Sequence, residues 1–334
     1  MGDTAERIFG IDTPEAFTAC ALDTFRRQYA LCPQYRQYAD LLEAAPDRVR
    51  DIADIPFLPI RFFKQYDIIS SAEPQPVAPQ KIFFSSSTTG QTPSRHCVTD
   101  VSLYERSFLA GFRHFYGAPE DYVILALLPA YLEREGSSLV YMADRLIRES
   151  GRPESGYYLY DHDRLYTTLA ELRSRGQKTL LLGVAFALLD FTEKYRLEGP
   201  NDSWLTVMET GGMKGRREEL TREELHRRLG GGFGLRAVHS EYGMCELLSQ
   251  AYSAGDGVFR APAWMRVIIR DINDPFRESD PGERGIIHII DLANRNSCSF
   301  IETEDTGRAY PDGSFTVEGR LQGSERRGCN MLIE

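Results

Sequence analysis

The sequence of 334 residues lacks any apolar run long enough to cross a membrane. Its longest apolar runs are Val123–Leu128 and Leu180–Leu189. Both are far shorter than the roughly 18 residues that a membrane span needs. The first segment, Met1–Asp12, has neither a basic start nor an apolar stretch, so no signal peptide is expected. We therefore expect a cytoplasmic protein without a membrane span.

The sequence also lacks cysteine pairs at metal-ligand spacing and an excess of positive charge. The six cysteines form no Cys-x-x-Cys pair and have no histidines at metal-ligand spacing. Such scattered thiols are typical of a reducing compartment, where one of them can still be reactive. The 39 basic residues against 49 acidic ones give a net charge of −10. This excess argues against nucleic acid or an anionic membrane as the main partner.

What the chain does contain, from about residue 81 to residue 240, is an alternation of strand and helix patterns. The expected strands are Lys81–Ser85, Tyr122–Leu127, Thr179–Leu182, Leu205–Glu209 and Ala237–Ser240. The expected helices are Asp100–Phe115, Ser137–Glu149, Asp161–Arg175, Ala185–Tyr195 and one opened by the capping box Thr221–Glu224. Strands that alternate with helices of this length predict an α/β fold with a mostly parallel sheet covered by helices.

The two ends of the chain have other patterns. Before residue 80 we expect helices from Thr13 and over Gln34–Ala44, and then an extended segment with Phe62 and Phe63. After about Leu247, short alternating strands between Pro and Gly turns predict a smaller β-rich lobe. The sequence thus predicts a helical N-terminal extension, an α/β nucleotide-binding core, and a β-rich lobe with a hinge-like tail, over residues 1–80, 81–246 and 247–334.

A cluster of small hydroxyl residues follows the strand predicted at Lys81–Ser85. It comprises Ser85, Ser86, Ser87, Thr88, Thr89 and Gly90. Small side chains let backbone N–H groups approach phosphate oxygens, and hydroxyls add further donors. The cluster is not a Gly-x-x-x-x-Gly-Lys-Ser/Thr loop, and a flexible Ser/Thr linker is the alternative.

Two more polar segments follow predicted strands, at the edge where open α/β sheets bind their ligands. They are Glu209–Met213 and Ser240–Glu246. In the second, Tyr242 could stack on a base, Gly243 would admit a close backbone approach, and Glu246 could hold Mg²⁺ against phosphate oxygens. The alternative is a simple Tyr-Gly turn with Glu246 at the start of a helix.

In order and spacing, these segments resemble the adenylate-forming superfamily of acyl-CoA synthetases, peptide-synthetase adenylation domains and luciferases, over about residues 80 to 330. Ser85–Gly90 is similar to the family's phosphate loop, and Tyr242–Glu246 to its Tyr-Gly-x-Thr-Glu motif. The resemblance implies ATP and Mg²⁺ as cofactors. It implies that the adenine is bound by the following residues: Gly211, Gly212 and Met213.

Further along the chain, Ile301–Asp305 falls where the family has Tyr-Arg-Thr-Gly-Asp, which implies that Asp305 binds the ribose hydroxyls. Gly319-Arg320 begins the family's hinge motif, which implies a catalytic part for Arg320. Only Thr303 and Asp305 match the Tyr-Arg-Thr-Gly-Asp motif. The chain also departs from the family at three other positions. Ser87 stands where the family usually has Gly, Ser94 where it has Lys, and Cys245 where it has Thr.

Because the chain stops just past the hinge motif, we expect no mobile C-terminal domain. This ending is similar to one branch, the acyl-protein synthetases of bacterial bioluminescence, or long-chain fatty acid–luciferin-component ligases. That resemblance implies activation of a fatty acid or other carboxylic acid as acyl-AMP, transfer to Cys329, and delivery to a partner acyl reductase. Two cations and a glycine before Cys329 favour its thiolate. The alternatives are an aryl- or acyl-CoA ligase that needs a domain in trans, and a non-catalytic acyl- or nucleotide-binding protein.

Overall fold

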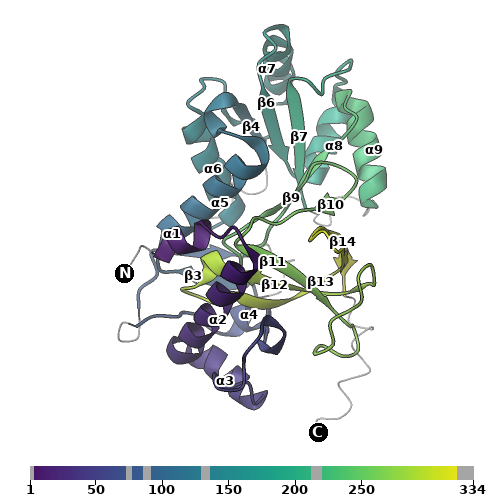
Figure 1. Ribbon diagram of the computed structural model, residues 1–334. Coiled ribbons are helices and arrows are strands. Elements are labelled where there is room, and N and C mark those ends of the chain that lie inside the picture. The colour runs from purple at the N-terminus through teal and green to yellow at the C-terminus, as the bar shows by residue number, and fades with distance from the viewer. Residues whose placement is uncertain (1–3, 73–76, 86–91, 129–135, 212–219, 322–334) are drawn as a thin grey trace. The chain divides into compact units, whose positions relative to one another are not determined.

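The computed structural model describes residues 4–72, 77–85, 92–128, 136–211 and 220–321 (Figure 1). The chain divides into two compact units, and neither of them is a continuous stretch. The first unit contains the residues up to Ser107, the short segment Cys245–Ser249 and the residues from Arg260 onward. The second contains Phe108–Met244 and Gln250–Phe259.

The second unit is built on a parallel sheet. Its strand order is β5 (Gly156–Tyr157), β4 (Val123–Leu127), β6 (Thr179–Gly183), β7 (Leu205–Thr210) and β8 (His239–Tyr242), and β9 (Ala251–Ser253) pairs with β8 in the antiparallel sense. Every residue of β4 and β6 is buried. Such continuous apolar strands are what a sheet covered on both faces requires.

Helices flank this sheet, as the alternating sequence pattern predicts (Figure 1). They are α6 (Ser138–Ser150), α7 (His162–Ser174), α8 (Ala185–Lys194) and α9 (Arg222–Phe233). Local chemistry fixes their ends: Ser137 caps α6 by accepting a hydrogen bond from the backbone N–H of Val140, and Gly151 ends it with a left-handed φ of 60°. The predicted α/β fold class is confirmed.

The first unit has a mainly antiparallel sheet. Four strands, β11 (Met265–Arg270), β12 (Gly285–Asp291), β13 (Phe300–Ala309) and β14 (Phe315–Arg320), pair in chain order, and β1 (Leu58–Pro59) joins β13 in parallel. A separate hairpin pairs β2 (Lys81–Phe84) with β3 (Arg95–Val98). The short bridge-forming strand β10 (Val258–Phe259) belongs to the second unit.

Helices of the N-terminal region belong to the same first unit. They are α1 (Thr4–Phe9), α2 (Pro14–Leu31), α3 (Pro33–Leu41) and α4 (Phe62–Gln65), followed by the start of α5 (Val101–Tyr116). The described residues also form three short 3₁₀ turns. Two of them, η1 (Ile52–Asp54) and η3 (Leu292–Asn294), belong to the first unit, and η2 (Pro119–Asp121) belongs to the second. The buried Gln28 of α2 donates to the carbonyl of Asn294 at 3.3 Å and accepts from the N–H of Ser299 at 3.0 Å. This side chain therefore fastens the N-terminal helices to the connection between β12 and β13.

Three expectations about local structure were wrong. The segment with Phe62 and Phe63 is not extended but forms one turn of helix, closed by the N–H of Tyr66 on the carbonyl of Phe62 at 2.8 Å. Glu246 does not begin a helix, the alternative given above, because residues 245 and 246 form a turn and β9 follows at Ala251–Ser253. The strands expected after Leu247 are short, whereas β13 runs for ten residues from Phe300 to Ala309.

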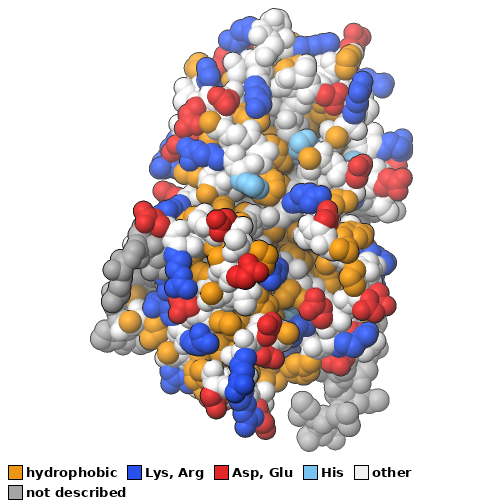
Figure 2. Space-filling model, viewed as in Figure 1, with side chains coloured by type: hydrophobic (Ala, Val, Ile, Leu, Met, Phe, Trp, Pro, Cys, Tyr) orange, Lys and Arg blue, Asp and Glu red, His pale blue; other side chains and the backbone are white. Residues whose placement is uncertain are grey.

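None of the helices in the part of the chain that the structure describes is both long and apolar enough to span a bilayer. Basic and acidic side chains are interspersed on the face shown in Figure 2.

Candidate functional site

Two carboxylates and an arginine meet in the first unit. Glu246 and Asp305 are buried, with only 4% and 8% of their surface exposed. The pairing of β13 with β14 places Asp305 opposite Arg320, whose Nε donates to Asp305 Oδ1 at 3.2 Å. Burial raises the pKa of Glu246, although a hydrogen bond from Ser94 and the charge of Arg320 oppose that rise. The four side chains therefore form one cluster.

This cluster lies at the base of the predicted phosphate loop. The backbone N–H of Ser85 donates to the carbonyl of Ser94 at 3.1 Å, and the N–H of Ser94 donates to Ser85 Oγ at 2.8 Å. The two ends of the segment between β2 and β3 are thus held together, and Ser94 also reaches Glu246. The end of this segment at Ser94 therefore lies next to a carboxylate.

His96 and Asn294 contact the backbone carbonyls of Cys245 and Glu246. His96 Nδ1 is 2.8 Å from the carbonyl of Cys245, and its Nε2 is 3.0 Å from Asn294 Oδ1. The Asn294 amide in turn donates to the carbonyl of Glu246 at 2.8 Å. Burial lowers the pKa of His96 to about 4. A neutral ring can donate to only one of its two acceptors, and we assign that bond to the closer one, the Cys245 carbonyl.

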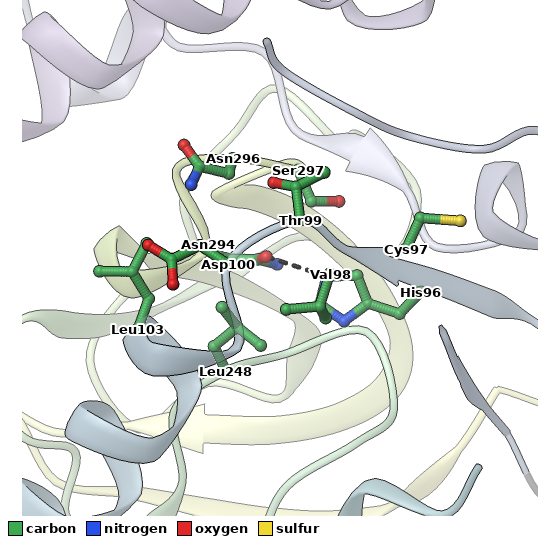
Figure 3. Close-up of a pocket in the computed structure, with 10 residues that line it drawn as sticks. All are labelled: His96, Cys97, Val98, Thr99, Asp100, Leu103, Leu248, Asn294, Asn296 and Ser297. Carbon is green, nitrogen blue, oxygen red and sulfur yellow. Dashed lines mark hydrogen bonds between the residues drawn. The ribbon is translucent and has the colours of Figure 1, made fainter. Parts of the chain in front are cut away.

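The space beside His96 is small. A pocket of about 10 Å³ is lined by His96, Cys97, Leu103, Leu248 and Asn294, among others (Figure 3). A cavity of that size holds about one water molecule. The pocket is therefore no substrate site, and the part played by His96 is to position the segment that carries Glu246.

The second unit carries the other predicted residues, at the ends of neighbouring parallel strands. The register pairs Thr210 of β7 with Glu241 of β8, so Gly211 and Tyr242 follow directly at the same edge of the sheet. Gly211 has a left-handed φ of 46°, which glycine adopts at little cost. A Cβ at Gly243 would lie 2.3 Å from Glu241 Oε1, so a side chain there would require the Glu241 carboxylate to move.

A buried polar cluster at this edge was missing from the sequence-based prediction. Ser240 Oγ donates to Glu209 Oε1 at 2.7 Å, and His226 Nε2 is 3.5 Å from the same oxygen. Thr210 Oγ1 donates to Glu241 Oε2 at 2.8 Å, while burial raises the pKa of Glu241 to about 7. The available signal was that both buried strands end in acidic and hydroxyl residues.

The other predicted site residues lie outside the described residues. They are Ser86, Ser87, Thr88, Thr89, Gly90, Gly212, Met213 and Cys329. Among the described ones, the structure groups Ser85, Glu246, Asp305 and Arg320 in the first unit. It groups Gly211, Tyr242 and Gly243 in the second unit.

No preformed cage for a metal is found in the described part of the chain, where no group of three or more His, Cys, Asp or Glu could hold an ion. The oxygen donors of Glu246 and Asp305 nevertheless fit the ligand preference of Mg²⁺. This ion usually takes one or two carboxylates from the protein and completes its octahedron with waters and substrate phosphates. The cluster therefore suits an ion that arrives together with a phosphate ligand.

No family model and no curated protein sequence matches this chain. Solved structures do match it. An open conformation of 2-hydroxyisobutyryl-CoA ligase, in complex with 2-HIB-AMP and CoA, aligns over 92% of this chain and 70% of its own, at 13% identity and a TM-score of 0.65. ATP-bound MatB from Rhodopseudomonas palustris aligns over 75% of this chain at 15% identity and a TM-score of 0.53.

The ATP-bound RpMatB-BxBclM chimera B3 also aligns with this chain, at 16% identity and a TM-score of 0.52. The chain spans about half the length of the MatB structures, since 50% of each of them is covered. At these identities the likeness is one of fold. The α/β fold of this chain is shared with 2-hydroxyisobutyryl-CoA ligase and MatB.

Proposed function

We propose that this protein activates a carboxylic acid with ATP, forming an acyl adenylate and pyrophosphate. The observation that carries the proposal is the cluster of Glu246, Asp305 and Arg320 at the base of the Ser/Thr segment. The fold shared with ATP-bound ligases supports it. In the reaction, a carboxylate oxygen attacks the α-phosphorus of ATP, the bond to the bridging oxygen breaks, and pyrophosphate leaves with that electron pair.

The residues of the chain would divide the work as follows. Backbone N–H groups and hydroxyls of Ser85–Gly90 would hold the phosphates, and Asp305 would accept hydrogen bonds from the ribose hydroxyls. Tyr242, Gly243, Gly211, Gly212 and Met213 would bind the base. Glu246 would hold Mg²⁺, which when bound neutralises charge on the phosphate oxygens. Arg320, beside Asp305, would add positive charge where the negative charge develops.

We further propose that the acyl group passes to a thiol. A free carboxylate does not react with thiols, whereas an acyl adenylate has a good leaving group. The thiolate of Cys329 would attack the acyl carbon, forming a thioester and releasing AMP. The substrate would be a long-chain fatty acid or another carboxylic acid, and a partner acyl reductase would take up the acyl group. Because the structural relatives include CoA ligases, CoA is the alternative acceptor.

Pyrophosphate exchange tests the activation step. In the presence of Mg²⁺, ATP and a panel of carboxylic acids, labelled pyrophosphate should appear in ATP only when a substrate acid is present. Glu246→Gln should lower the exchange rate by at least tenfold, because it removes the charge that attracts Mg²⁺. Glu283→Gln, at an exposed turn, is the matched control. An absence of exchange with every acid would leave a nucleotide-binding protein instead of an enzyme.

The same substitution separates catalysis from folding. Gln keeps an oxygen that can accept the Ser94 hydrogen bond, and the neutral side chain avoids burying a charge. The melting temperature of Glu246→Gln should therefore stay within a few degrees of the parent. A collapse of that temperature would make Glu246 a structural residue and remove the metal from the proposal.

A further inference from the structure

A second pocket lies in the first unit, between α1, the start of α5 and the turn after η3. Its volume is about 410 Å³. Small-molecule sites in proteins usually measure about 300–1,000 Å³, so the space is sufficient for a ligand. The lining includes Arg106, Arg295, Asn296, Asp100 and Leu103. None of these residues belongs to the cluster around Glu246.

The Nε of Arg295 is buried and makes no hydrogen bond in the part of the chain that the structure describes. Burial, with the nearby charge of Arg27, lowers the pKa of Arg295. Burying an arginine N–H group without an acceptor costs free energy. The arrangement therefore favours the binding of an anion near Arg295.

A second arginine near Arg295 also has a buried Nε without a hydrogen-bond partner among the described residues. This residue is Arg27 on α2. Cys20, Asp23 and Arg27 recur at helical spacing on α2, and all three act on the charge of Arg295. Asp23 is already engaged with Arg7, whose Nη1 lies 3.2 Å from its Oδ2. The positive charge around Arg295 is thus only partly compensated.

Among the remaining lining residues, Arg106 and Asn296 can donate to an anion, whereas Asp100 carries a negative charge of its own. Arg106 lies over the ring of Phe9, with 5.1 Å between its Cζ and the ring centroid. Asp100 is the one carboxylate in the described lining. Its Oδ1 accepts two hydrogen bonds from the first turn of α5, one from Ser102 N at 3.0 Å and one from Ser102 Oγ at 2.6 Å. Asn296 lies on the far side of the small pocket from His96 (Figure 3).

We propose that this pocket binds a small organic phosphate. Arg295 and Arg106 would pair with the phosphate oxygens, the Asn296 amide would donate to them, and Leu103 would contact the organic part. A phosphate is favoured over a carboxylate because its three terminal oxygens can serve two guanidinium groups at once. The inference does not depend on the proposed adenylation, because it uses none of the residues of that site.

Calorimetric titration with phenyl phosphate and with inorganic phosphate tests this proposal, with chloride at matched ionic strength as the reference. Saturable binding of phenyl phosphate at one site is expected, and weaker binding of inorganic phosphate, which lacks a part that can contact Leu103. If only inorganic phosphate binds, the ligand is the free ion and the organic part of the proposal is wrong. If neither binds more strongly than chloride does, there is no site.

Variants locate the binding. Arg295→Gln and Arg106→Gln should each weaken phenyl phosphate binding by at least about tenfold, since each removes a charge-assisted hydrogen bond. Arg48→Gln removes the same charge from an exposed pair with Glu43 and should bind as the parent does. Arg106 is exposed, so its variant should fold even if the Arg295 variant does not. Unchanged binding in Arg106→Gln, or a loss in Asp305→Ala, would place the phosphate elsewhere and overturn the proposal.

Discussion

At the scale of single residues, Asp305 carries the most specific prediction about ATP. Its pair with Arg320 is open to solvent on the arginine side, where 78% of the side chain is exposed. Such a pair contributes little to stability. Asp305→Ala should weaken ATP binding by about 2–4 kcal/mol through the loss of two charge-assisted hydrogen bonds. Isothermal titration calorimetry measures this difference, with the exposed Asp280→Ala as control. An unchanged affinity would contradict the assignment.

Glu241 gives a prediction about pH. Burial raises the pKa of this carboxyl from its usual value of 4.5 to about 7. A folded state with a raised carboxyl pKa holds the proton more tightly than the unfolded state does. The stabilising contribution is therefore complete below about pH 4.5 and is lost as the pH rises towards 7. The loss between these limits is on the order of 3 kcal/mol.

Urea unfolding at pH 5 and pH 8 measures that contribution. Glu241→Gln keeps an acceptor for Thr210 Oγ1 but cannot ionise. This variant should lose less stability than the parent between the two pH values. Glu171→Gln, an exposed change on α7, should behave as the parent does. Equal pH dependence in Glu241→Gln and the parent would show that this carboxyl is not responsible.

At the scale of elements, the β13–β14 pair positions Asp305 and Arg320, and Gly307 makes that pairing possible. A Cβ at Gly307 would lie 1.9 Å from the carbonyl oxygen of Thr316. Gly307→Ala should therefore push the two strands apart, with a loss of about 1–3 kcal/mol in unfolding free energy and weaker ATP binding. Gly231→Ala on α9 meets no atom within 4 Å and should stabilise the protein slightly, which makes it the matched control. Unchanged stability in Gly307→Ala would mean that the strands can shift without cost.

The elements also show how far sequence reasoning reaches. The strands β4 and β6 and the helices α6 to α9 were predictable, because a buried parallel sheet leaves uninterrupted apolar runs and capped helices between them. The turn of helix at Phe62 was not, since the prolines before it are typical of extended chain. The end of β13 was also missed, because polar residues such as Glu304 and Asp305 interrupt its pattern. The length of β13 depends on its pairing with β14, and a short stretch of sequence around β13 carries no information about that pairing.

At the scale of the whole molecule, the candidate site is made of residues far apart in the chain. The Tyr-Gly-x-x-Glu segment is itself divided, with Tyr242 in the second unit and Glu246 in the first. Motif order did not predict the contact between Asp305 and Arg320, which follows from the pairing of β13 with β14. It could not predict that Ser94 contacts Glu246 or that His96 holds the backbone of Cys245. Those contacts arise from tertiary packing, for which the sequence carries no periodic signal.

The proposed transfer of the acyl group requires a thiol that can ionise, for which the chain offers six cysteines. Five of them are described, and all five are buried. Burial raises the pKa of each, to about 12 for Cys97 and well above the usual value for Cys245 and Cys298. Thiols of this kind ionise too little to act as nucleophiles. Cys329 is the remaining candidate, and the cations before it favour its thiolate.

We therefore expect Cys329→Ser to leave pyrophosphate exchange intact and to abolish the acyl-protein thioester. The reason is that exchange needs only the adenylating site, whereas the thioester needs a thiolate. Intact-protein mass spectrometry before and after hydroxylamine measures the acyl adduct, and Cys20→Ser, a change at a buried thiol, is the control. A hydroxylamine-sensitive adduct that persists in Cys329→Ser would move the acceptor to another cysteine. If no adduct forms on the parent unless CoA is added, and acyl-CoA then appears, the final acceptor is CoA.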